Sequence, residues 1–222
     1  MELLGQDWAR ASAGFVSGTL VHAREGLIAI EKLKVGDWVL SAPQVSHGVP
    51  AYKRVVKVAE HHDQVIISVR CRVPDKANPG KVSYKRVTGA IAHFFWTDEE
   101  GWTPAVKLGG SYSGPCRVRL ADGASTDLDG RVFVYATDQL NIGWIASNGK
   151  HGEGWLFDFN TGQFVTKDDV PYDAKQWCVT DEDMWRGFRT TVYSIEVEDH
   201  HTYFVGAHGL WVRDGLNGGT GQ

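Results

Sequence analysis

The 222-residue chain lacks long apolar runs. No stretch approaches the roughly 18 consecutive apolar residues of a membrane-spanning helix. The first residues, MELLGQDWARAS, also lack the basic-then-apolar layout of a secretory signal peptide. We therefore expect a soluble chain that has no membrane partner and carries no export signal of its own.

Basic segments are absent as well. Acidic residues outnumber basic ones by 27 to 23, which gives a formal net charge of −4, and no block of Lys and Arg occurs. Proteins that bind polyanions carry a clustered positive surface. We therefore expect no nucleic-acid partner.

Cysteine is scarce, and its number is odd. Cys71, Cys116 and Cys178 show no paired spacing, which argues against a disulfide framework and a zinc site and favours buried thiols. Adjacent residues of a strand point to opposite faces, so a pair of neighbouring histidines offers one metal ligand at most. No HExxH-like spacing occurs among the clustered histidines, which are His61–His62, His93, His200–His201 and His208. We expect neither a metal nor another cofactor.

What the chain does contain favours strands. It is 42% hydrophobic and 23% charged, which suits one globular domain, or one domain with a large insertion, and we expect a monomer. Its 26 glycines and 9 tryptophans are spread through short apolar runs. This composition predicts an all-β fold with many tight turns.

Turn residues and β-branched runs predict the first strands. A hairpin is expected from Phe15–Val21 and Leu27–Ile30, closed by the turn Arg24–Gly26. The turn Lys34–Asp37 leads into a strand at Trp38–Leu40. Two further strands are expected on either side of a polar loop, Glu60–Asp63, followed by a third strand. These are Val55–Val58, Val65–Val73 and Val82–Thr88.

Between about residues 109 and 187 the chain becomes rich in Gly and Trp, and we interpret this region as an insertion of extra hairpins. One short helix is expected within it, at Thr180–Arg189. Its tryptophans could form the core of an added sheet or line a ligand groove. The expected turns are Asp122–Gly123, Asp129–Gly130, Asn148–Gly149 and Thr161–Gly162.

The last strand, Thr191–His201, alternates strictly between apolar and polar residues. A period of two places Tyr193, Ile195, Val197, Asp199 and His201 on one face, unless a bulge intervenes. His201 is therefore expected to point inward and His200 toward water.

Three ordered blocks together resemble a Hint domain, the fold shared by Hedgehog autoprocessing domains and inteins. The blocks are FVSGTLVHAREGLIAIEKLKVGDWVLS, AHFFWTDEEGWTPAVKL and VYSIEVEDHHTYFVGAHGLWVRD. The similarity is to the pretoxin Hint module of bacterial polymorphic toxins in particular. It implies a leader at residues 1–13, a Hint domain at 14–214 that contains the insertion at about 109–187, and a flexible tail at 215–222.

The resemblance implies a compact all-β domain of two pseudo-symmetric halves that cuts its own backbone. In such domains a Cys or Ser at the first residue attacks the preceding carbonyl. A histidine of the middle block protonates the leaving amide nitrogen, and a threonine helps to hold the oxyanion. A late histidine then assists cyclisation of a terminal asparagine. The partners implied are the chain's own flanking segments, either exteins or a toxin cargo, and the compartment stays open, with a secreted bacterial toxin as one setting.

The position of the nucleophile is vacant, because Gly14 stands where the family has Cys or Ser. Ser12 lies two residues before it and Ser17 three residues after it. A shift of two residues along a strand moves an atom by about 6.5 Å, too far for attack on a fixed carbonyl. Neither serine is expected to substitute.

The other positions match unevenly. His93 falls on the family's proton donor, but the threonine three residues earlier is Ala90, and Thr88 lies two residues further back. His201 falls on the late histidine. Each of these histidines could instead be a core residue held by a hydrogen bond.

At the C-terminal boundary the family's His-Asn pair is replaced by Arg213 and Asp214. Arginine stays protonated and cannot shuttle a proton, so Arg213 can only polarise a carbonyl or pair with a carboxylate. Asp214 is followed by Gly215, which permits either slow cleavage at this bond or a simple turn.

The sequence therefore predicts an autoprocessing Hint domain whose N-terminal step is lost. Two alternatives remain. The first is a non-catalytic Hint scaffold or interaction module of a polymorphic toxin, and the second is residual cleavage at Asp214–Gly215.

Overall fold

The protein is described by a computed structural model that covers residues 11–45, 48–75, 78, 80–109, 116–137, 139–146, 154–165 and 187–214. Within these ranges the secondary structure is β-strand, apart from two single 3-10 turns, η2 (Ile30–Lys32) and η3 (Ala105–Lys107). The strands are β1 (Phe15–Val16), β2 (Leu20–Ala23), β3 (Gly26–Ala29), β4 (Trp38–Ser41), β5 (Ala51–Pro74), β6 (Val82–Ala90), β7 (Phe94–Thr97), β8 (Gly101–Pro104), β9 (Arg117–Arg119), β10 (Ser125–Ala136), β11 (Ile142–Ala146), β12 (Gly154–Asp158), β13 (Gln163–Val165), β14 (Arg189–Val197), β15 (Thr202–Val205) and β16 (Leu210–Arg213). The described residues include no helix of the length and apolarity that a membrane crossing needs.

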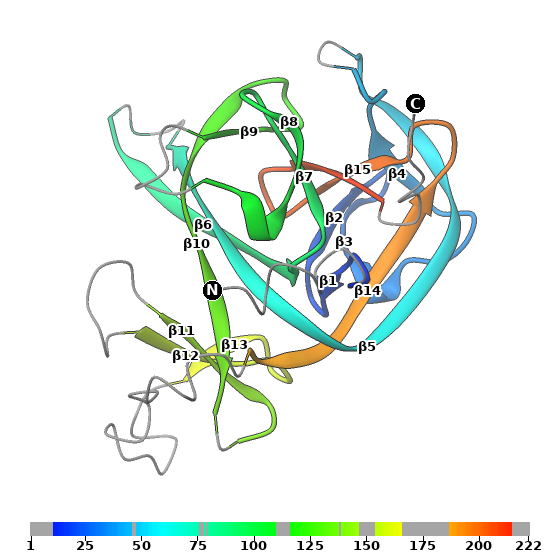
Figure 1. Ribbon diagram of the computed structural model, residues 1–222. Coiled ribbons are helices and arrows are strands. Elements are labelled where there is room, and N and C mark those ends of the chain that lie inside the picture. Colours follow the sequence, from blue (N-terminus) through cyan, green and yellow to red (C-terminus); the bar gives the residue numbers. More distant parts are fainter. Residues whose placement is uncertain are drawn as a thin grey trace.

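Strand β5 organises the molecule. It is 24 residues long and curves around the body in Figure 1. Its first half pairs with β4 and β14, and its second half pairs with β6 on one side and β10 on the other. All of these pairings are antiparallel. Segments far apart in the sequence are therefore held along one continuous backbone.

The predicted loop at Glu60–Asp63 is wrong, because β5 runs through it without interruption. The polar side chains of this stretch are tolerated since its backbone hydrogen-bonds to β14 while its side chains lie at or near the surface. Asp63 has a positive φ of 55°, and the register between β5 and β14 shifts beside it. The loop signal thus marks a bulge in a long strand.

Two other local predictions need correction. The expected strand Phe15–Val21 is broken by a turn, in which the Thr19 amide donates to the Val16 carbonyl at 3.2 Å. Asp129–Gly130 lies inside β10, where the register against β5 shifts between Leu128 and Gly130. A bulge again stands where a turn was expected.

Other turn predictions are confirmed. The hairpin of β2 and β3 closes through Arg24 and Glu25, and turns occur at Asp122–Gly123 and Thr161–Gly162. Asn148–Gly149 and most of the expected helix Thr180–Arg189 lie outside the described residues. Its described end is not helical, because Arg189 already begins β14.

The strands of the region expected as an insertion are divided between the main sheet and a small second sheet. Strands β9 and β10 join the main sheet, while β11, β12 and β13 continue from β10 as a small separate sheet, at the lower left of Figure 1. This small sheet packs on the outer face of β1, β5 and β14. The cluster that joins them contains Val16, Ile66, Ala90, Val134, Ile145, Phe188 and Val192. The main core lies on the other face of the sheet and includes Phe15, Val21, Ile67, Phe95, Ile195, Tyr203 and Val212.

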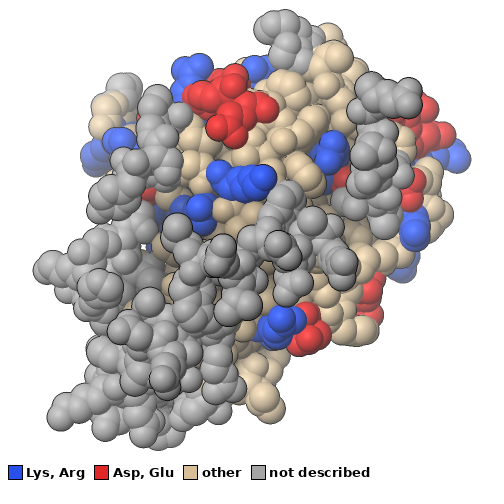
Figure 2. Space-filling model, viewed as in Figure 1, with Lys and Arg blue, Asp and Glu red and all other residues tan. Residues whose placement is uncertain are grey.

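Charged side chains of both signs are interspersed over the face shown in Figure 2. Among the described residues, several charged side chains are paired, as in the ion pairs of Asp98 with Arg117 and Arg119 at 3.1 and 3.2 Å. No single broad patch of one sign covers the described part of this face.

Three backbones approach closely where β1 lies between β14 and β6. Phe15 is opposite Tyr193 on one side and Gly89 on the other. A Cβ atom added at Gly89 would lie 2.6 Å from the Gly14 carbonyl oxygen and 2.8 Å from Cδ1 of Phe15. Glycine at position 89 is therefore required by space.

We expect Gly89→Ala to lower the free energy of unfolding by about 1–3 kcal/mol, because the added methyl group overpacks a backbone contact that cannot yield as a side chain would. Urea denaturation followed by fluorescence measures this change. Lys85→Ala, at an exposed position of the same strand, is the control and should change stability by no more than about 0.5 kcal/mol. Equal stability of the two variants would show that β1 is not held as described.

Candidate functional site

The N-terminal boundary lies in this close contact. Gly14 has φ +152°, a conformation that side chains rarely adopt. A Cβ atom there would lie 2.7 Å from the Tyr193 carbonyl oxygen and 2.9 Å from Cγ2 of Val192. The Gly14 carbonyl accepts a hydrogen bond from the Ala90 amide at 2.9 Å. The position that resembles the family's nucleophile thus has neither a reactive side chain nor the space for one.

His93 lies directly behind this boundary, between β6 and β7. Its ring is fully buried, with centroid distances of 4.1 Å to Phe15, 5.9 Å to Phe95 and 6.1 Å to Tyr203. Neither ring nitrogen has a hydrogen-bond partner among the described residues. The alternative prediction for His93 is a core histidine held by a hydrogen bond, and no described residue supplies that bond.

Burial of His93, together with the nearby positive charge of Arg213, lowers its pKa to about 3. The ring is consequently neutral at pH 7. A neutral imidazole is a far weaker acid than an imidazolium, so in this state His93 is poorly suited to protonate a leaving amine.

The C-terminal boundary contains a second histidine. Oδ2 of Asp214 lies 3.2 Å from Nδ1 of His201 and accepts a hydrogen bond from the Val197 amide at 3.3 Å. The Asp214 amide in turn donates to the His201 carbonyl at 2.9 Å. Burial raises the pKa of the Asp214 carboxyl, and the contacts with Val197 and His201 oppose that rise. His201 and Asp214 therefore form one hydrogen-bonded unit.

The backbone that leads to His201 differs from the prediction of a continuous strand. Strand β14 ends at Val197, and a turn follows over Glu198–His200. Asp199 has a positive φ of 62° and is exposed, with its carboxylate 2.6 Å from Nζ of Lys53. The prediction that Asp199 faces inward is wrong, because the alternation stops before it. The side chain of His201 is 37% exposed, so it is only partly inward.

Arg213, on β16, is opposite Phe94 of β7 on one side and Thr202 of β15 on the other. Its guanidinium is 4.2 Å from the centroid of the Phe94 ring and 5.9 Å from that of Trp102. Burial lowers the pKa of Arg213, and the charge of Asp214 opposes this. Arg213 is thus held as a cation over an aromatic ring.

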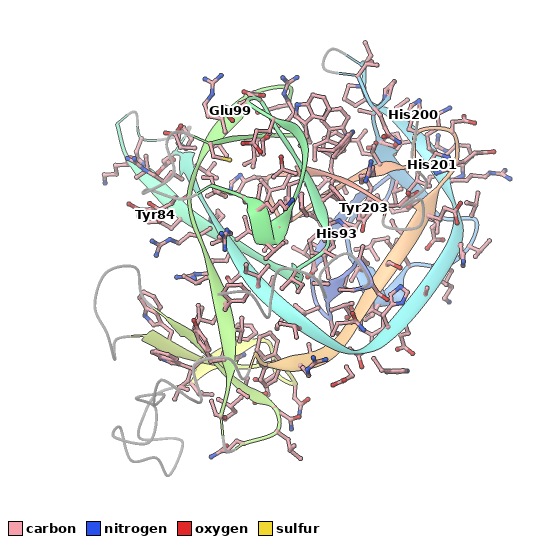
Figure 3. All side chains as sticks on the ribbon, in the orientation of Figure 1. Tyr84, His93, Glu99, His200, His201 and Tyr203 are labelled. Carbon is pink, nitrogen blue, oxygen red and sulfur yellow. The ribbon has the colours of Figure 1, made fainter. Side chains whose placement is uncertain are left out.

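Sequence reasoning missed Tyr203, which joins the two boundaries. Tyr203 is fully buried, its ring lies 6.3 Å from that of Phe15, and its hydroxyl has no partner among the described residues. Burial and the charge of Asp214 raise its pKa well above 10. Figure 3 shows Tyr203 and His93 together in the interior, with His201 nearer the rim. Its position directly after the His201–Thr202 pair was the available signal.

The two boundaries also lie against the same strand, β14. Gly14 contacts β14 at Tyr193, and Asp214 contacts it at Val197. Four residues of strand span about 13 Å. The structure therefore brings the two ends of the expected domain side by side, as two adjoining half-sites.

Thr88 and Ser17 lie away from this site. Thr88 is on the opposite face of β6 from Gly89, where together with Ser17 it lines a separate cavity. The Ser12 amide donates to Oε1 of Gln64 at 3.1 Å, which ties this segment to β5. Residue 90, the family's oxyanion position, is a buried alanine.

Three further histidines bond to neighbouring segments of the chain. Nε2 of His61 lies 3.0 Å from Oγ of Ser194, and Nδ1 of His62 lies 3.0 Å from Oγ1 of Thr191. Nε2 of His22 lies 2.9 Å from the Gly206 carbonyl. In the part of the chain that the structure describes, no group of three or more His, Cys, Asp or Glu side chains is placed to hold a metal. Cys71 is buried, and Cys116 is partly buried and not in a disulfide.

No protein-family model matches the chain, and no curated protein matches it. Solved structures do. The bacterial intein-like domain from Clostridium thermocellum aligns with a TM-score of 0.54 at 18% identity, covering 91% of this chain and 98% of that one. A DnaB intein from Synechocystis sp. PCC 6803 aligns with a TM-score of 0.51 at 10% identity, covering 92% and 100%. The chain has the Hint fold.

The Hint fold confirms the predicted fold class. At these identities the likeness concerns the fold, and the roles of individual residues rest on the geometry above. The Hint fold extends through most of this chain, because each alignment covers more than nine-tenths of it.

The buried His93 should make stability depend on pH. Its folded-state pKa of about 3 lies below the ordinary value of 6.5, so the unfolded chain binds an extra proton between these values. Its contribution to stability is therefore complete above pH 6.5 and is lost as the pH falls toward 3, by up to about 1.4 kcal/mol per pH unit. The free energy of unfolding, measured by urea denaturation at several pH values between 4.5 and 7, should therefore change less steeply with pH in His93→Leu than in the unaltered chain.

Phe95→Leu is the matched control, since it alters the same aromatic cluster without removing a titrating group. Its free energy of unfolding should change with pH as steeply as that of the unaltered chain. If His93→Leu also kept the pH dependence of the unaltered chain, His93 would not be neutral and desolvated in the folded state.

Proposed function

We propose that this chain is an autoprocessing-type Hint domain that has lost its N-terminal acyl shift and keeps the segments on either side of it covalently joined. The observation that carries this proposal is the state of Gly14. A shift of the peptide bond to a side-chain ester or thioester needs an oxygen or sulfur nucleophile at this residue. Gly14 has none, and the space a side chain would occupy is taken by the backbone of β14.

The surroundings of Gly14 agree with such a loss. Ala90 offers no hydroxyl to an oxyanion, and Arg213 cannot accept and return a proton. His93 is held neutral in an aromatic cage. Three groups of the ancestral reaction are thus missing or altered, while the fold that would hold them is kept. The role is that of a scaffold for its flanking segments, for which exteins or a toxin cargo are the proposed identities.

The full chain should keep its N-terminal residues 1–13 through prolonged incubation, even with dithiothreitol or hydroxylamine, because no thioester or ester forms at Gly14. Intact mass spectrometry measures this directly. Gly14→Cys should likewise retain them, since a side chain there meets backbone atoms at 2.7 Å. Gly14→Ala serves as its control for folding.

Release of residues 1–13 from the unaltered chain would refute the proposed loss. Release from Gly14→Cys alone would mean that only the nucleophile is missing and that the rest of the site is competent.

A second candidate function is slow cleavage after Asp214. The observation that favours it is the buried Asp214 carboxyl, held by His201 and the Val197 amide beside its own backbone. In this reaction a carboxylate oxygen of Asp214 attacks the Asp214 carbonyl carbon. Water donates a proton to the nitrogen of Gly215 as the bond to that nitrogen breaks, so that it leaves as an amine. Water then opens the five-membered anhydride to give a C-terminal aspartic acid.

If this second activity exists, incubation should remove residues 215–222, in a first-order reaction that Asp214→Ala abolishes. Intact mass followed over several days between pH 4 and 8 measures it. Because burial raises the pKa of Asp214, the ionised nucleophile should become available at a higher pH than for an ordinary aspartate. Asp199→Ala, at an exposed neighbouring carboxylate, should leave the rate unchanged. A constant mass at every pH excludes this activity and leaves the scaffold role.

A further inference from the structure

One edge of β6 is open. β6 pairs with β5 along its length, and on its other side the described pairing is limited to β1 at Gly89. The Ala90 amide points to that second side, where it donates to the Gly14 carbonyl. Amides alternate along a strand, so those of Arg86 and Thr88 point the same way. No described strand pairs with them there.

A cavity of about 570 Å³ lies along this open edge. It is bounded by residues 85–88 of β6, the turn after β1, the turn between β15 and β16, and the small sheet β11–β13. Its apolar lining comes from both cores of the protein, because Val205 and Leu210 belong to the main core while Ile145 and Phe157 belong to the outer one. A strand placed here would therefore have apolar surroundings on both of its faces.

The cavity also carries positive charge. Lys85 and Arg86 line it, and no Asp or Glu occurs among its described lining residues. The half-buried Arg86 guanidinium lies 5.0 Å from the ring centroid of Trp155, and Arg86 is directly opposite Arg70 in the register of β5 and β6. One carboxylate, Asp129, lies beside these two guanidiniums and is ion-paired with Arg70. The charges at this end of the cavity thus favour an added carboxylate.

We propose that this edge binds an extended peptide segment of another protein by β-strand addition. The backbone of the segment pairs with the Arg86 and Thr88 amides, its apolar side chains enter the cavity from both faces, and an acidic side chain lies beside Lys85 and Arg86. Main-chain pairing supplies affinity, and the cavity and the two cations supply specificity. This binding site is separate from Gly14, His93 and Asp214, none of which lines the cavity, so it does not depend on whether the chain cleaves itself.

The direct test uses the full chain and a fluorescein-labelled peptide, Ser-Val-Ile-Thr-Val-Asp-Asp. Fluorescence anisotropy should give a Kd below about 1 mM, the weakest affinity such a titration resolves. A peptide with both Asp replaced by Lys should bind at least about tenfold more weakly. Amide hydrogen exchange should slow at Arg86 and Thr88 when the peptide is added, whereas the Val87 amide, which faces β5, should not change.

A second experiment reverses the charge on the protein and uses the same two peptides. Lys85→Glu combined with Arg86→Glu should invert the preference, so that the Lys peptide binds more tightly than the Asp peptide. Arg72→Glu, at an exposed position of the neighbouring strand β5 but outside the cavity lining, is the control and should keep the original preference. Unchanged chemical shifts in the main core confirm that each variant is folded.

Three outcomes would overturn the proposal. One is the absence of any anisotropy change up to about 1 mM peptide. Another is binding without slower exchange at Arg86 and Thr88, which would mean that the cavity takes an apolar ligand without strand pairing. The third is a charge-reversed protein that keeps the preference of the unaltered chain.

Discussion

The structure depends on the close approach of three backbones at the start of the domain. Strand β1 fits between β14 and β6 only because Gly14 and Gly89 carry no side chains, and the Gly14 carbonyl is bonded to the Ala90 amide. This contact places Phe15 in the main core and against the His93 ring. The same contact fills the space in which a nucleophilic side chain would need to move. The interaction that anchors the N-terminal boundary therefore also leaves no room for a side chain at Gly14.

The polar groups around this contact are costly to bury. Neither nitrogen of His93 nor the Tyr203 hydroxyl has a partner among the described residues, and a buried polar group left without a hydrogen bond costs about 1–3 kcal/mol. A stability-optimised core would place apolar residues at these two positions. Packing alone therefore does not explain the two polar side chains at these positions. The second half-site differs, because Asp214, His201 and the Val197 amide satisfy one another.

The Gly- and Trp-rich region is part of the body of the protein. Strands β9 and β10 extend the main sheet, and β11–β13 fold back over its outer face to complete a second core. A cavity remains where this small sheet meets the free edge of β6, the turn after β1 and the turn between β15 and β16. Trp155 lies over Arg86 at this boundary, so the added sheet supplies aromatic surface where the main sheet supplies positive charge. Of the two roles open for the tryptophans, the described ones serve partly as core, as with Trp144 beside the cluster of Ile142 and Leu156.

The sequence by itself determined the strand-rich fold class, the turn Arg24–Gly26 of the first hairpin and the turns at glycines 123 and 162, because turn chemistry depends on residues within a few positions of one another. The resemblance of three blocks placed His93 and His201 at the two boundaries, and the structure puts Phe15 against the first and Asp214 against the second. Only the tertiary structure decided that β5 runs unbroken through Glu60–Asp63, that the last alternation ends at Val197, and that Tyr203 connects the half-sites. These features depend on partners more than a hundred residues away, such as β14 for β5 and Phe15 for Tyr203. A local pattern contains no information on which strand will cover it, how closely that strand will approach, or how far burial will shift a pKa.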